Sequence, residues 1–153
     1  MKLVEALVLR ADCQRKVEQL KQRLERVMRV QQGEQPAELP DVLTAELEKT
    51  LDELVDWIKK INKTNSLSQF DQDRSLSDAL AERDRFLQQR NIFHDLLEAA
   101  AIKQDLFSSS EVKFYRTMDV NELQKNVDEL SRRYRELDLK VQEKNWSTEL
   151  IED

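Results

Sequence analysis

The sequence predicts an all-α fold, an elongated up-down helical bundle built from antiparallel coiled-coil hairpins. Ala, Leu, Glu, Lys and Arg make up about half of the 153 residues, a composition typical of long or supercoiled helices. The chain has one Gly and two Pro, which leaves little room for tight β-turns. Apolar residues recur at steps of three and four over long segments, as they do on one face of a helix. We expect one domain over residues 1–153.

The first two helices are predicted over residues 2–32 and 41–63. The only Gly and both Pro lie between them, in residues 33–40, so the chain turns there. Because this connection is short, the two helices should form an antiparallel hairpin. The predicted stripe of the first helix is Cys13, Val17, Leu20, Leu24 and Val27, and that of the second is Leu43, Leu47, Leu51, Leu54, Ile58 and Ile61.

A third helix is predicted over residues 76–101. Ser75 and Asp78 have the spacing of a capping box, in which each side chain accepts a hydrogen bond from the other residue's backbone amide. Arg83 and Arg90 interrupt its apolar stripe, as Arg10 interrupts that of the first helix. A charge on such a seam needs a partner, and the sequence alone does not identify the partners of these three arginines.

The fourth helix is predicted over residues 120–143. Its apolar residues follow a strict alternation of three and four, which is the coiled-coil spacing. Helices of this length offer more seam than one hairpin covers, so we expect a symmetric partner and hence a homo-oligomer. The candidate oligomer seam is Val120, Leu123, Val127, Leu130, Tyr134, Leu137 and Val141.

A short strand is predicted over residues 111–117, where apolar and polar residues alternate. A single strand leaves its backbone groups unpaired, so it needs a partner. That partner is either residues 66–70 in the other long loop, which would give a small two-stranded β element, or the same segment of another subunit.

The sequence contains no recognisable catalytic constellation, and we expect no enzyme activity, cofactor or metal. Glu53 and Asp56 have an E-x-x-D spacing that can hold Mg²⁺ on a helix, but such a site needs carboxylates from at least two helices. His94 is four residues from Glu98, the spacing of an ordinary surface pair on a helix. Cys13 lies on the predicted apolar stripe, where a thiol acts as a small hydrophobe.

Charge and hydropathy argue against nucleic-acid and membrane partners. The formal net charge is −6, whereas a nucleic-acid binder carries a positive surface. Mean hydropathy is −0.73, and no apolar stretch approaches the ~20 residues that span a bilayer, so we expect a cytoplasmic protein. RNA contact through arginines of the first and fourth helices stays open as a further alternative. These arginines are Arg23, Arg26, Arg29, Arg132, Arg133 and Arg135.

The leading hypothesis is a non-enzymatic oligomeric coiled-coil scaffold or interaction protein. The alternative, from a different class, is a protein that binds a small ligand or nucleotide, with or without catalysis, at the junction of the second and third helices. Polar side chains from both helices would converge there on an anion or small molecule. This predicted polar cluster consists of Asn62, Thr64, Asn65, Asp78, Glu82, Arg83 and Asp84.

Several separated segments resemble a family of small bacterial proteins. These segments are residues 2–7, 61–65, 77–84 and 110–114, together with Asn145 and Trp146. The family members are uncharacterised helical proteins, sometimes labelled septicolysin. The resemblance implies a bacterial cytoplasmic protein and brings no catalytic or binding residues with it. The label suggests a cholesterol-dependent pore-forming toxin, an activity that we do not infer because the sequence shows no secretion signal.

Overall fold

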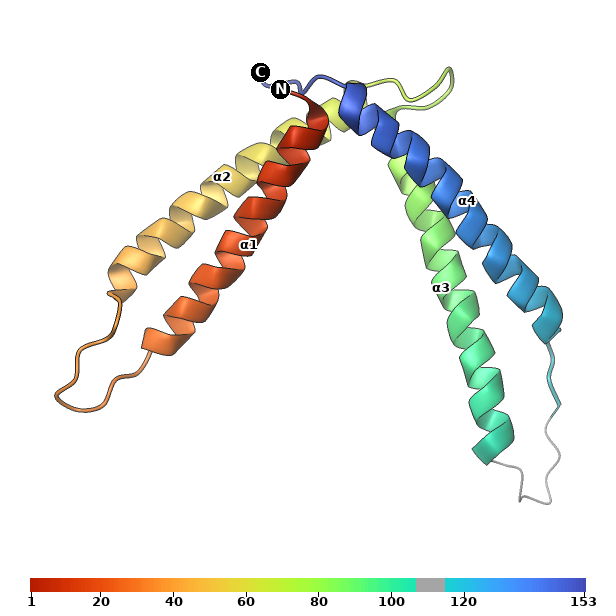
Figure 1. Cartoon of the computed structure of the whole chain (residues 1–153), viewed down its shortest axis with the longest axis horizontal. Helices are drawn as coiled ribbons and strands as arrows, with labels where there is room; N and C mark the ends of the chain where they lie inside the picture. The colour runs from red at the N-terminus through yellow and green to blue at the C-terminus, as the bar shows by residue number, and fades with distance from the viewer. Residues whose placement is uncertain (107–114) are drawn as a thin grey trace. The chain divides into compact units, whose positions relative to one another are not determined.

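The computed structural model describes residues 1–106 and 115–153, and these residues contain four helices (Figure 1). The helices are α1 (Leu3–Val27), α2 (Pro40–Leu67), α3 (Leu76–Leu106) and α4 (Val120–Ser147). Helix α1 packs along α2, and α3 packs along α4, in two antiparallel pairs. The predicted all-α class is confirmed, since the described residues contain no β-sheet and only two isolated β-bridges.

The chain divides into two compact units, and the single domain over residues 1–153 stays a prediction. The first unit comprises Met1–Ser68 and Asn145–Asp153, and the second comprises Gln69–Lys144. The physical reason is that each helix pair buries its own facing apolar stripes, so that each unit has a separate core. Helix α4 contributes its last residues, from Asn145 onward, to the first unit.

The turn between α1 and α2 contains the Gly and Pro residues that predicted it. Helix α1 ends at Val27, earlier than predicted, because Val27 is the last residue of its buried face and the following Met28 is exposed. Gly33 has a φ of +88°, a conformation that a residue with a Cβ rarely adopts. Pro40 is the first residue of α2, where its missing amide hydrogen would have no partner in any case.

The core of the first hairpin differs from the predicted stripe at one position of α2. Thr50 is 1% exposed, whereas the neighbouring Leu51, which we had assigned to the stripe, is 40% exposed. Burial of Thr50 is tolerated because its hydroxyl donates a hydrogen bond of 2.8 Å to the carbonyl of Glu46. At the far end of the hairpin the core consists of Leu20, Val27 and Leu43, with Leu24 and Leu47 packed against them.

The segment after α4 folds back onto the first unit, and we call this arrangement the terminal clasp (residues 1–3, Thr64 and 148–151). The backbone amide of Leu3 donates to the carbonyl of Thr148, and that of Leu150 donates to Met1, both over 2.9 Å. The amide of Ile151 donates to the Thr64 hydroxyl oxygen over 2.9 Å. Leu3, Thr64 and Leu150 are buried, so the clasp joins backbone pairing to apolar packing.

In the second unit, α3 begins with the predicted capping box. The amide of Asp78 donates to Ser75 Oγ over 3.1 Å, and the amide of Ser75 donates to Asp78 Oδ2 over 2.9 Å. Leu76 and Ala79 follow and are fully buried. The predicted strand over residues 111–117 lies largely outside the described residues, and its described part, residues 115–117, has no strand structure.

Candidate functional site

The predicted polar cluster is divided between the two units. Asn62, Thr64 and Asn65 lie in the last turns of α2, in the first unit. The Thr64 hydroxyl is fully engaged, because it donates to the carbonyl of Lys60 over 2.8 Å and accepts from Ile151. The other four residues, Asp78, Glu82, Arg83 and Asp84, lie in the first turns of α3, in the second unit.

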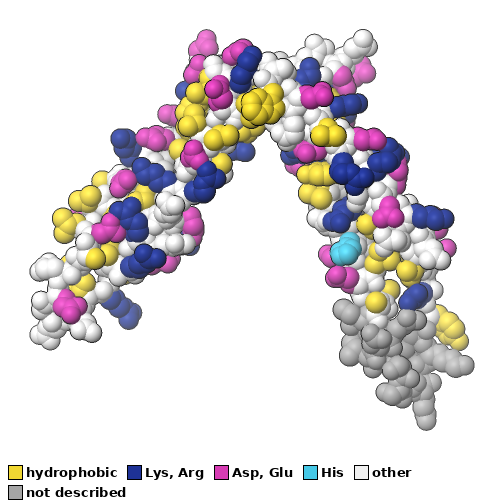
Figure 2. All heavy atoms as spheres, in the orientation of Figure 1, with side chains coloured by type: hydrophobic (Ala, Val, Ile, Leu, Met, Phe, Trp, Pro, Cys, Tyr) yellow, Lys and Arg dark blue, Asp and Glu magenta, His cyan; other side chains and the backbone are white. Residues whose placement is uncertain are grey.

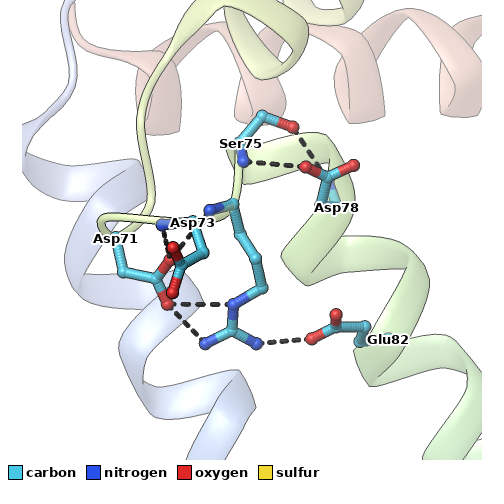
Figure 3. Close-up of polar contacts among 6 residues, drawn as sticks. Asp71, Asp73, Ser75, Asp78 and Glu82 are labelled. Carbon is cyan, nitrogen blue, oxygen red and sulfur yellow. Dashed lines mark hydrogen bonds and ion pairs between the residues drawn. The ribbon is translucent and has the colours of Figure 1, made fainter.

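The polar contacts at the start of α3 centre on Arg74, which precedes the helix (Figure 3). Its guanidinium donates to Asp71 Oδ2 through Nε over 2.9 Å and through Nη2 over 2.6 Å, and it also pairs with Glu82. Asp71 Oδ1 accepts the backbone amides of Asp73 and Arg74. The hydrogen bond from Arg74 lowers the pKa of Asp71, and the bond to Asp71 raises the pKa of Arg74. The loop before α3 is therefore held in place by the ion pairs that Arg74 makes with Asp71 and Glu82.

Arg83 and Arg90 join α3 to α4. Arg83 Nη1 donates to Asp138 Oδ1 over 2.9 Å, and Arg90 Nε donates to Ser131 Oγ over 3.1 Å. The two arginines are seven residues apart, and so are their partners, in the opposite direction along α4. These contacts therefore set one antiparallel register with a heptad repeat. Arg10 differs, because its buried Nε has no hydrogen-bond partner within the described part of the chain.

The apolar stripe of α4 is covered within a single chain. Five of its residues are buried, and Val120 and Tyr134 are half-buried. The stripe forms the α4 side of the α3–α4 seam, so a second copy would have to displace α3 to reach it. The buried residues are Leu123, Val127, Leu130, Leu137 and Val141.

The remaining candidates for chemistry lie apart from one another. Among the described residues, no group of three or more His, Cys, Asp or Glu side chains is placed to hold a metal ion. Glu53 and Asp56 are exposed on α2. His94 Nε2 lies 3.3 Å from Glu98 Oε1 on the surface of α3. Cys13 is buried, and desolvation raises the pKa of its thiol, which keeps it protonated at neutral pH.

Three of the six arginines considered for RNA contact are paired with carboxylates. Arg132 and Arg133 on α4 both donate to Glu129, and Arg132 also donates to Glu136. In α1 and the following turn, Arg23 forms a two-pronged pair with Glu38. These pairs neutralise charges that a phosphate backbone would otherwise contact.

Sequence reasoning missed the role of Asp71 and Arg74. The Asp71 carboxylate accepts the amides two and three residues later, which is the geometry of an Asx turn. The presence of Asp in a polar loop was the one signal that could have indicated such a turn. Sequence reasoning also placed Leu51 in the core, whereas Leu51 is exposed.

The fold and its side chains define a protein of helical hairpins, in which some polar groups join the two helices of a pair and others pair within one helix. Across the described residues, no helix combines the length and the apolar character needed to cross a membrane. The chain belongs to a family of unknown function (DUF6847), whose model matches residues 10–150. No curated protein matches it.

One solved structure is similar over nearly its whole length. It is described as a functionally unknown conserved protein from Corynebacterium diphtheriae. The two sequences are 41% identical, each chain is covered to 99%, and the TM-score is 0.89. The resemblance to proteins labelled septicolysin stays a prediction.

Proposed function

We propose that this chain is a non-enzymatic interaction protein that associates with copies of itself through apolar side chains on the outer faces of its helices. The observation that carries this proposal is the exposure of large aliphatic residues on structured helices of both units, where a lone hairpin would carry polar residues. Figure 2 shows such hydrophobic side chains among the charged ones on both hairpins.

These exposed residues lie away from the seams of their own hairpins. Ile92 is half a turn around α3 from Arg83, which faces α4. Leu139 on α4 follows the half-buried Asp138 and is largely exposed. Removing apolar surface from water is worth roughly 25 cal/mol per Å², so covering such residues on contact with another copy would favour association. The exposed aliphatic residues on helices are Val8, Val42, Leu51, Val55, Leu67, Ile92, Leu96 and Leu139.

Several polar side chains of the candidate ligand cluster are already hydrogen-bonded, which supports binding through apolar faces rather than a ligand site. An anion or nucleotide site needs free donors, whereas Arg74 and Arg83 already donate to carboxylates and Thr64 is engaged on both sides. Nothing in these contacts favours the small-ligand or RNA alternatives.

Light scattering over a dilution series tests the proposal against the chain mass of 18.1 kDa. We expect a multimer at high concentration and a falling average mass on dilution. A mass of one chain at every concentration would overturn the proposal.

A further inference from the structure

We propose that one flank of α2 is the contact between two copies of this chain, and that the two α2 helices pair antiparallel about a two-fold axis near Val55. We call this surface the α2 flank; it consists of Leu51, Val55 and Ile58 with Glu48, Asp52 and Lys59 around them. The inference rests on the self-association proposed above and names the surface that carries it.

The α2 flank is a second apolar line beside the line that packs on α1. Leu51, Val55 and Ile58 are spaced by four and three residues, so they lie along one side of the helix. Leu51 and Val55 are exposed, and Ile58 is half-buried. The buried line of α2, which includes Thr50 and Ile61, faces α1 instead. Helix α2 therefore presents apolar side chains on two sides, and α1 covers one of them.

The charges of α2 are separated along its length. The half before Val55 is mainly acidic, with Lys49 as its one basic residue, and the half that follows Asp56 is basic. Two copies of such a helix attract each other when they run antiparallel and repel each other when they run parallel. The acidic residues are Asp41, Glu46, Glu48, Asp52, Glu53 and Asp56, and the basic residues of the second half are Lys59, Lys60 and Lys63.

The same two-fold axis satisfies the apolar and the charged residues. An axis through Val55 brings this residue against its own counterpart, places Leu51 opposite Lys59 of the second copy, and places Asp52 opposite its Ile58. Leu51 is therefore one position from Ile58 of the second copy, and Asp52 is one position from its Lys59. An isologous contact requires this reciprocity, because each surface must complement itself.

The charged residues beside the line have no other partner. Glu48, Asp52 and Lys59 are exposed and form no ion pair or hydrogen bond within the described part of the chain. Glu48, Asp52 and Asp56 also follow one another at steps of four, a spacing at which like charges repel along a helix. A lysine from a second copy beside Asp52 would relieve this repulsion, which favours a copy of this chain as the occupant.

A charge exchange tests the pairing. The variants are Asp52→Lys, Lys59→Asp and the double variant, each measured by sedimentation over a dilution series. Because each single reversal places two pairs of like charges across the axis, we expect the dimer dissociation constant to rise about tenfold or more. The double variant restores both pairs with opposite polarity, and its dissociation constant should return to within about threefold of the original. Failure of the double variant to recover would overturn the antiparallel register.

A matched pair of apolar variants tests the surface itself. Val55 is 46% exposed and Val30, which lies in the turn between α1 and α2, is 49% exposed. We expect Val55→Glu to raise the dissociation constant at least tenfold, because two carboxylates would meet at the axis, while Val30→Glu leaves it unchanged. Circular dichroism checks that both variants keep their helices.

The outcomes separate the two proposals. If the unaltered protein is a monomer at every concentration, the proposed self-association fails. If it is a multimer and Val55→Glu associates as well as the unaltered protein, self-association stands and the assignment to the α2 flank is overturned.

Discussion

Replacing Thr64 by Val tests the terminal clasp through a single hydrogen bond. Valine keeps the branched shape of the buried side chain but cannot accept the amide hydrogen of Ile151, which lies 2.9 Å from the Thr64 oxygen. A partly buried amide left without an acceptor costs about 1–2 kcal/mol. For a chain of this size, that loss lowers the thermal midpoint by roughly 2–8 °C.

Thr50 provides the matched control for this experiment. It lies on the same helix, is equally buried, and makes the same hydrogen bond to the carbonyl four residues before it. No amide donates to Thr50 within the described part of the chain, so Thr50→Val should change the free energy of unfolding by less than about 0.5 kcal/mol.

Urea denaturation gives the stabilities, and amide hydrogen exchange gives the local effect. We expect the amide of Ile151 to exchange at least tenfold faster in the Thr64→Val variant and at an unchanged rate in Thr50→Val. Equal stability of the two variants, together with an equally protected Ile151 amide, would refute the role of Thr64 in the clasp.

Two further predictions concern the core and the surface charges. Leu20→Ala should lower the free energy of unfolding by about 3–5 kcal/mol because Leu20 is fully buried in the α1–α2 core. Leu139→Ala, at an exposed position, should lower it by less than about 0.5 kcal/mol. Chemical denaturation of both variants checks this difference. Hydrogen bonds from Arg132 and Arg133 lower the pKa of Glu129 from 4.5 to about 2. A carboxyl whose pKa is lower in the folded state stabilises the fold above its unfolded pKa and loses this contribution as the pH falls from 4.5 towards 2. NMR titration should therefore find the Glu129 carboxyl still ionised at pH 3.5. The Glu129→Gln variant should lose stability less steeply than the unaltered protein as the pH falls from 4.5 towards 2. A titration midpoint of Glu129 near 4.5 would contradict its pairing with the two arginines.

Local sequence patterns predicted where α3 begins and where the chain turns between α1 and α2. The capping residues Ser75 and Asp78 and the Gly and Pro residues of the first turn are local determinants, because each acts on a backbone within a few residues of itself. This is why the four helices could be placed from the sequence, with errors of a few residues at their ends.

Thr50 and Leu51 show where hydropathy patterns stop being informative. Both fit an apolar line at steps of three and four, and hydropathy favours Leu51, yet α1 covers Thr50. The choice depends on the rotation of α2 about its axis, which the packing of the whole hairpin sets, and on a backbone hydrogen bond that makes Thr50 tolerable in the core.

Partners that are distant in sequence could not be assigned before the fold was known. Arg83 pairs with Asp138, 55 positions away, and Ile151 pairs with Thr64, 87 positions away. The sequence offered many carboxylates to Arg83, and only the register between α3 and α4 selects Asp138. The residues of the candidate ligand cluster belong to different units, a division that the sequence did not indicate.

The terminal clasp also orders the events of folding during synthesis. The second unit is one continuous segment, Gln69–Lys144, so it is complete once Lys144 has left the ribosome. The first unit needs residues 148–151, which are translated after everything with which they pair. Helices α1 and α2 can form their hairpin early, but Leu3 and Thr64 stay open to water until residues 148–151 have left the ribosome. The unit that begins first is thus the one that is completed last.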